Sequence, residues 1–158
     1  MKIEFFHASK YGNGLKVAEE FQNQMKAKGH EVNIHNIKDV KPNTIQSADL
    51  YVFASPGRIG KPIGSMRRFL KKISLPAKTR YAVISTEMKP KADKKTGRIP
   101  SKEETDKWQR IIPIMDELLQ TKDLIKVTEM RVMVIDMKGP LEDGWQKEVM
   151  SFSSRIVQ

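Results

Sequence analysis

The sequence contains no cysteine. This excludes disulfide bonds, thiolate metal sites, cysteine nucleophiles and cysteine-bound iron–sulfur clusters. Any redox activity would therefore depend on a bound cofactor. No apolar run is long enough to span a bilayer, and the N-terminus lacks the small-residue cleavage site of a signal peptide. We therefore expect a cytoplasmic protein without a membrane span.

Acidic residues are scarce relative to basic ones, with 19 Asp and Glu against 29 Lys and Arg, a net charge of +10 and a pI of about 9.8. A positive field attracts nucleic acid, anionic lipid or an acidic protein. The basic residues are spread along the chain without interleaved aromatic residues, so specific nucleic-acid recognition is not expected. An acidic protein partner and a generally basic surface both remain compatible with this charge.

The pattern of apolar residues predicts five β-α units in one domain, residues 1–158. Strands are expected from Ile3 onward and at 31–37, 49–55, 80–86 and 129–136. The strand at 31–37 alternates apolar and polar residues, which is typical of a sheet edge, whereas the next strands are almost continuously apolar. Right-handed crossovers between parallel strands then give an α/β three-layer sandwich.

Three helices follow the later strands. One is predicted at about 63–73, and another begins at Ser101, which forms a capping box with Glu104. Trp108 is expected on the buried face of this second helix, and Pro113 can kink or break it. The last helix is expected to carry Glu142 and Asp143 in its first turn and to bury Trp145.

The first loop, from Ser9 to Gly14, joins the first strand to the first helix. Glycines that accept unusual backbone angles, a serine hydroxyl and the N-terminus of a helix together suit a phosphate group. Asn13 is expected to cap the helix, and Lys10 and Lys16 can neutralise the phosphate. The loop contains neither the G-x-G-x-x-G dinucleotide pattern nor the Walker sequence.

This loop resembles the phosphate loop of the flavodoxin family, in which a hydroxyl residue precedes a T-G-N-T-like tetrapeptide. Tyr11-Gly12-Asn13-Gly14 stands at the tetrapeptide and Ser9 at the hydroxyl residue. The segment 54–60, which contains Ser55-Pro56, and the segment 85–88 are similar in position to the two family loops that flank the flavin ring. The resemblance implies a flavodoxin-like three-layer sandwich with a five-stranded parallel sheet in the order 2-1-3-4-5.

The resemblance also implies FMN as the cofactor and electron transfer as the function. The cofactor-binding residues that it indicates are Ser9, Lys10, Tyr11, Gly12, Asn13, Gly14, Ser55, Pro56, Gly57, Arg58, Ile59, Gly60, Thr86, Glu87 and Met88. The chain departs from the family at Tyr11, Gly14 and Gly57, which replace threonines. No aromatic residue lies between Tyr81 and Trp108, so Arg58 or Ile59 is expected on one face of the ring and Met88 on the other.

No catalytic residue is predicted. No Ser/His/Asp constellation is evident, and His7, His30 and His35 have no metal-ligand spacing. Acidic residues near the end of the last strand are common for structural reasons. The flavodoxin resemblance together with the basic charge favours a redox carrier with an acidic redox partner, and with a higher reduction potential than acidic flavodoxins have.

Two alternatives remain open at this stage. The long basic segment 87–100 lacks periodicity, and such loops are often functional. It could form a substrate wall in an enzyme of the same fold, such as an NAD(P)H-dependent flavin or quinone reductase or a protoporphyrinogen-oxidase-like enzyme. Alternatively, the domain has lost FMN and binds an acidic partner.

Overall fold

Parallel strands form the central sheet in the order β2-β1-β3-β5-β6. The computed structural model describes residues 1–158. The strands are β1 (Lys2–His7), β2 (Glu31–Asn36), β3 (Leu50–Arg58), β5 (Arg80–Met88) and β6 (Ile125–Val134), and the two-residue β4 (Lys61–Pro62) pairs antiparallel with β3. Because β5 and β6 are the fourth and fifth predicted strands, the predicted order 2-1-3-4-5 is confirmed.

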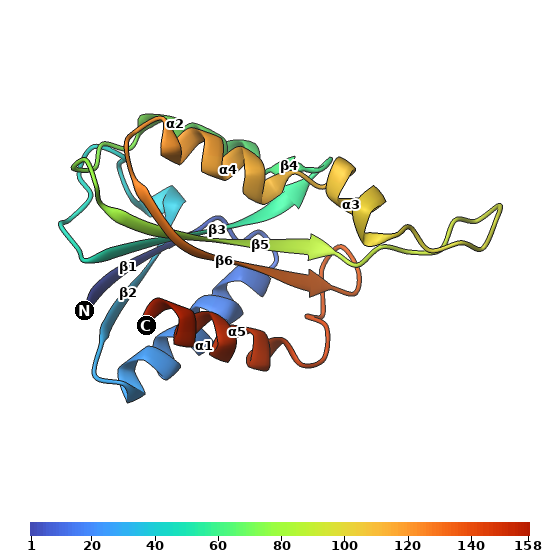
Figure 1. Ribbon diagram of the computed structural model, residues 1–158, viewed down its shortest axis with the longest axis horizontal. Helices are drawn as coiled ribbons and strands as arrows, with labels where there is room; N and C mark the ends of the chain where they lie inside the picture. The colour runs from blue at the N-terminus through green and yellow to red at the C-terminus, as the bar shows by residue number, and fades with distance from the viewer.

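Helices cover both faces of the sheet (Figure 1). One face carries α1 (Asn13–Ala27) and α5 (Trp145–Ile156), and the other carries α2 (Gly64–Lys72) and α4 (Ile111–Gln120). Successive residues of a strand point to opposite faces, so Phe5 joins the α1/α5 core and Phe6 joins the α2/α4 core. Each face of the sheet therefore has its own apolar core, as the apolar strands predict. None of the helices is long and apolar enough to cross a membrane.

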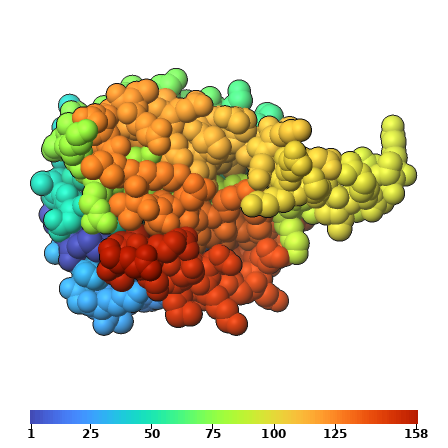
Figure 2. All heavy atoms as spheres, in the orientation of Figure 1, coloured from blue at the N-terminus to red at the C-terminus, as the bar shows by residue number.

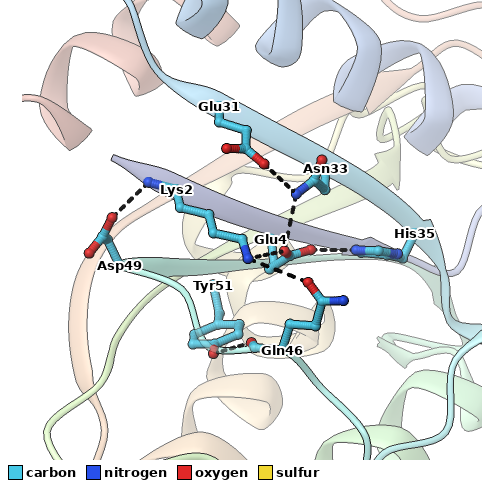
Figure 3. Close-up of polar contacts among 8 residues, drawn as sticks. All are labelled: Lys2, Glu4, Glu31, Asn33, His35, Gln46, Asp49 and Tyr51. Carbon is cyan, nitrogen blue, oxygen red and sulfur yellow. Dashed lines mark hydrogen bonds and ion pairs between the residues drawn. The ribbon is translucent and has the colours of Figure 1, made fainter.

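The edge strand β2 closes over a buried carboxylate. Glu4 lies on β1 with its side chain almost fully buried, and it contacts His35 and Asn33 of β2 (Figure 3). The Asn33 amide donates to Glu4 Oε1 at 3.2 Å, and Lys2 Nζ lies 3.9 Å from the same oxygen. A buried carboxylate requires such partners, so this cluster fixes the position of β2 against β1.

The segment 54–60, which the resemblance indicated as a loop, forms the end of β3 and the turn of a hairpin. Strand β3 extends to Arg58 and turns through Ile59 and Gly60 into β4. Both turn residues have positive φ, 52° and 73° respectively, which is the geometry of a tight two-residue hairpin turn. The strand thus ends three residues later than predicted, because Pro56 pairs with β5 and Gly57 and Arg58 pair with β4.

The helix predicted after Ser101 is broken in two. The capping box is confirmed, because Glu104 N–H donates to Ser101 Oγ at 3.2 Å. However, α3 (Lys102–Trp108) ends before α4 begins, since Arg110 N–H donates to the hairpin carbonyl of Gly60 at 2.7 Å. The break precedes Pro113, which lies in the first turn of α4, where a missing N–H costs little.

The break also changes the environment of Trp108, which is 61% exposed. The prediction that it belongs to the core is therefore wrong. Trp145 is half-buried and packs against the α1/α5 core, as expected.

The last unit also differs in its boundaries from the prediction. Strand β6 begins at Ile125 and ends at Val134, several residues earlier than expected at its start. Helix α5 begins at Trp145, so Glu142 and Asp143 precede it and do not lie in its first turn. Glu142 instead forms an ion pair with Lys89 at 2.8 Å, which joins the segment before α5 to the end of β5.

Residues 89–100, which we call the arm, project from the end of β5 (Figures 1 and 2). A turn at its tip is closed by Gly97 N–H donating to the Asp93 carbonyl at 2.8 Å. Near its end, Arg98 pairs with Glu104 at 2.6 Å, and this contact lowers the pKa of Glu104 to about 2. The arm is thus connected to α3 by an exposed ion pair.

A more buried ion pair holds the base of the arm. Glu87 is buried and lies 2.9 Å from the Arg131 guanidinium of β6. Arg131 also contacts Asp106 of α3 at 2.6 Å. One arginine therefore joins β5, β6 and α3.

Replacing Arg131 by Met should lower the free energy of unfolding by about 3 kcal/mol, because it leaves the Glu87 carboxylate buried without its partner. Urea unfolding of the two variants and of the natural sequence measures this loss. R98M, which removes an exposed pair, is the matched control and should lower the free energy of unfolding much less. Equal losses in the two variants would show that the Glu87 pair has no special structural role.

Candidate cofactor site

A cavity of about 440 Å³ opens at the carboxyl ends of the central strands. In parallel α/β sheets this edge is where ligands bind, because the loops of neighbouring strands meet there. The loops after β1, β3, β5 and β6 all contribute to the walls. The lining residues are Ser9, Lys10, Tyr11, Asn13, Gly14, Pro56, Gly57, Arg58, Ile59, Ile63, Thr86, Met88, Val134 and Met137.

The loop after β1 presents unpaired backbone donors. Gly12 precedes α1 with φ 89°, a left-handed conformation that favours glycine. Because Asn13 and Gly14 open the helix, their N–H groups have no acceptor in the protein. Gly12 N–H donates to Ser9 Oγ at 2.9 Å, which leaves the Ser9 hydroxyl proton free for a ligand. This arrangement can bind an anion through several N–H and O–H donors.

Asn13 does not cap α1, contrary to the prediction. It is the first helical residue, and no side chain caps the helix. Its side-chain amide instead packs against Gly139 in the segment after β6, where an added Cβ would lie only 2.9 Å from Asn13 Oδ1. Asn13 thus joins the first loop to the segment that follows β6.

Cations surround the first loop. Lys10 Nζ and Lys138 Nζ lie over the Tyr11 ring, 5.5 Å and 5.8 Å from its centre. Arg58 lines the opposite wall. None of these three cations forms an ion pair with an acidic residue of the protein, so their positive field is available to a bound anion.

The second wall is the β3–β4 hairpin. Ser55 is buried, donates to the Pro56 carbonyl at 2.8 Å and accepts from Ile63 N–H at 3.2 Å. Its hydroxyl is therefore used to shape the hairpin and does not line the cavity. Ile59 at the turn is 79% exposed and does line the cavity.

The third wall is apolar. It has three apolar side chains, from Met88 at the end of β5, Val134 at the end of β6 and Met137 after β6. An apolar slot beside an anion-binding loop suits a flat ring system joined to a phosphate.

A family model described as "Flavodoxin domain" matches residues 5–131. The chain belongs to the flavodoxin family. Among curated proteins, no sequence matches the chain significantly. The family assignment agrees with the strand order and with the position of the cavity.

Solved structures show the same fold. Flavodoxin 2 of Bacillus cereus aligns with a TM-score of 0.76 at 15% identity, covering 99% of this chain and 98% of that chain. Oxidised flavodoxin 1 of the same organism gives 0.71 at 16%, covering 99% and 97%. The rubredoxin oxygen:oxidoreductase of Desulfovibrio gigas gives 0.72 at 14%, covering 98% of this chain and 35% of that chain.

The flavodoxin fold brings most of the residues indicated by the sequence together around the cavity, from Ser9 in the first loop to Met88 in the third. The others lie outside it. Gly12 shapes the first loop, Gly60 turns the hairpin, and Ser55 and Glu87 direct their side chains into hydrogen bonds within the protein.

Sequence reasoning missed Ile63, Val134 and Met137. Val134 and Met137 had a usable signal, because the last parallel strand must end at the same sheet edge as the others. Ile63 reaches the cavity only because β4 folds back along β3, which the sequence pattern does not show.

A buried histidine supports the first loop. His7 ends β1, and its Nδ1 accepts a hydrogen bond from Ser9 N–H at 3.2 Å. An accepting nitrogen requires the neutral imidazole, and burial lowers the pKa of His7 below its ordinary value of 6.5. Neutral His7 therefore contributes fully to the free energy of unfolding above pH 6.5, and this contribution is lost as the pH falls below that value.

We therefore expect NMR titration of the apoprotein to show His7 protonating below pH 6.5, with the Ser9 amide resonance shifting at the same midpoint. The variant H7N keeps an acceptor on the side chain but cannot titrate, so the Ser9 shift should disappear. A His7 midpoint at or above 6.5 would contradict this assignment.

Proposed function

We propose that the protein binds FMN and transfers electrons. The observation that carries the proposal is the pair of unpaired N–H groups at Asn13 and Gly14, which lie beside the Ser9 hydroxyl at one end of the apolar cavity. Flavodoxins bind FMN, and the chemistry of this donor set fits the phosphate of that cofactor. The walls formed by Ile59, Met88 and Met137 fit its ring.

Each wall has a separate role in this proposal. Ser9 and the N–H groups of the α1 N-terminus hold the phosphate. The hairpin and the end of β5 flank the ring, with Ile59 or Arg58 on one side and Met88 on the other, in place of aromatic residues. The FMN ring supplies one- and two-electron redox chemistry when it is bound, and the protein supplies position, electrostatics and limited access for water.

The unpaired cations should also set the redox properties. Lys10, Arg58 and Lys138 around the cavity favour a negatively charged reduced flavin. We propose that the reduction potential is therefore higher than in acidic flavodoxins. The same field, together with Lys94 and Lys95 at the arm tip, favours an acidic cytoplasmic redox partner.

A second candidate function is an FMN-dependent oxidoreductase, such as a flavin or quinone reductase that uses NAD(P)H. It is favoured by the arm, which adds a wall next to the cofactor cavity. Steady-state oxidation of NAD(P)H in the presence of a quinone distinguishes this enzyme from a carrier, because a carrier has no turnover without its partner proteins.

The FMN proposal is tested by comparing FMN with riboflavin, which lacks the phosphate, in fluorescence titrations. The fluorescence of FMN should be quenched on binding, and the quenching should saturate at one equivalent. FMN should bind far more tightly than riboflavin. In S9A the affinity for FMN should fall about tenfold, because a hydrogen bond to a charged group is lost, while riboflavin binding stays unchanged.

Ser154 on the exposed surface of α5 provides the matched control, and S154A should bind FMN like the natural sequence. If FMN fluorescence does not change at all, the domain does not bind this cofactor. Equal affinity for FMN and riboflavin would instead show that the first loop does not bind the phosphate.

A further inference from the structure

A second cavity, of about 530 Å³, lies beside the cofactor cavity and shares Gly57, Ile59 and Met88 with it. Its other walls come from the arm and from α3 and the residue after it, including Pro90, Trp108 and Gln109. FMN binding in the first cavity does not explain this one. The arm and α3 create it by lying next to the β3–β4 hairpin.

Exposed apolar side chains surround this second pocket. Trp108 and Ile59 are both largely exposed, and Trp108 packs beside Gly60, where an added Cβ would lie 3.7 Å from the indole Cδ2. Large apolar side chains grouped around a concave surface are a mark of a ligand site. The flat indole of Trp108 and the ring of Pro90 favour a planar ligand.

Ile59 adopts a backbone conformation that does not suit it. Its φ of 52° is left-handed, and a β-branched side chain is strained there. Asparagine or glycine is the favoured residue at this position of such a turn. The side chain is exposed and therefore adds little to the apolar core. It lines both cavities instead.

The pocket also has an unsatisfied acceptor. The Gln109 side-chain oxygen Oε1 is buried and accepts no hydrogen bond. It lies 3.8 Å from the position of a Cβ added to Gly57, at the boundary of the two cavities. A buried acceptor without a donor is costly, and an O–H or N–H group on a ligand would satisfy it.

The charges at the mouth favour an anion. Lys89 and Lys91 line the pocket, and their pairs with Glu142 and Asp136 are solvent-exposed and therefore weak. Glu87 and Glu104 also line it. Glu87 is held by the partly buried Arg131, and the pair of Glu104 with Arg98 is as exposed as those of the lysines, so the two lysines still outweigh Glu104 at the mouth. The two lysines can thus turn toward an acidic group on a ligand.

We propose that the second pocket binds a planar aromatic small molecule with a hydroxyl or N–H group toward Gln109 and an acidic group toward Lys89 and Lys91. The proposal does not require FMN, so it is tested on the apoprotein. Its failure leaves the FMN titration unaffected, and failure of FMN binding leaves this test intact.

The probe is 6-hydroxynaphthalene-2-sulfonate, and naphthalene-2-sulfonate is its matched analogue without the hydroxyl. Isothermal titration calorimetry should show the hydroxyl probe binding about fivefold more tightly. In Q109L this preference should disappear, while the affinity for the analogue stays within twofold. Gln109 does not line the cofactor cavity, so this variant also reports which cavity the probe occupies.

Ile59 gives an independent test. I59N should raise the melting temperature, because asparagine suits the turn, and should weaken both probes about fivefold. I99N makes the same change at another exposed isoleucine that lines neither cavity, and should leave the affinities unchanged. Absence of binding, or a preference for the hydroxyl probe that is unchanged in Q109L, would overturn the proposal, because Ile59 lines both cavities and Gln109 lines only the second.

Discussion

The first turn of α1 is the constraint on which the site depends. A helix that begins at Asn13, directly after the left-handed Gly12, leaves N–H donors without acceptors at a point where water or a ligand must supply them. The parallel sheet then determines which residues surround those donors, because the loops after β1, β3, β5 and β6 all open at the same edge. An anion-binding end and an apolar slot follow from these two facts together.

This member of the flavodoxin family has a strongly basic composition and a cavity whose apolar lining side chains, apart from Tyr11, are aliphatic. Isoleucine and methionine side chains line the cavity where the proposed ring would lie, and unpaired lysines and an arginine lie around it. Apolar side chains can cover a ring, but they do not stack as an aromatic does. If the chain binds FMN as proposed, its affinity would therefore depend more on the anion-binding loop and on the positive field. The arm adds a second pocket to this arrangement, next to the proposed cofactor.

The fold was largely predictable, because the alternation of apolar strands with amphipathic helices is a local signal and the first loop has a distinctive sequence. The strand order required the family resemblance. The β3–β4 hairpin and the break before α4 were not predictable, since both involve one long-range bond, from Arg110 N–H to the Gly60 carbonyl. Trp108 has the spacing of a core residue only if the helix continues, and that same bond stops it.

The most direct test of the account is the ¹H–¹⁵N correlation spectrum of the apoprotein during titration with FMN. We predict that the amides of Asn13 and Gly14 shift most, in proportion to bound FMN, and that the shifts are complete at one equivalent. Smaller shifts should follow in the hairpin and at the end of β5. If FMN binds but these two amides do not move, the helix N-terminus is not the phosphate site and the account of this cavity is wrong.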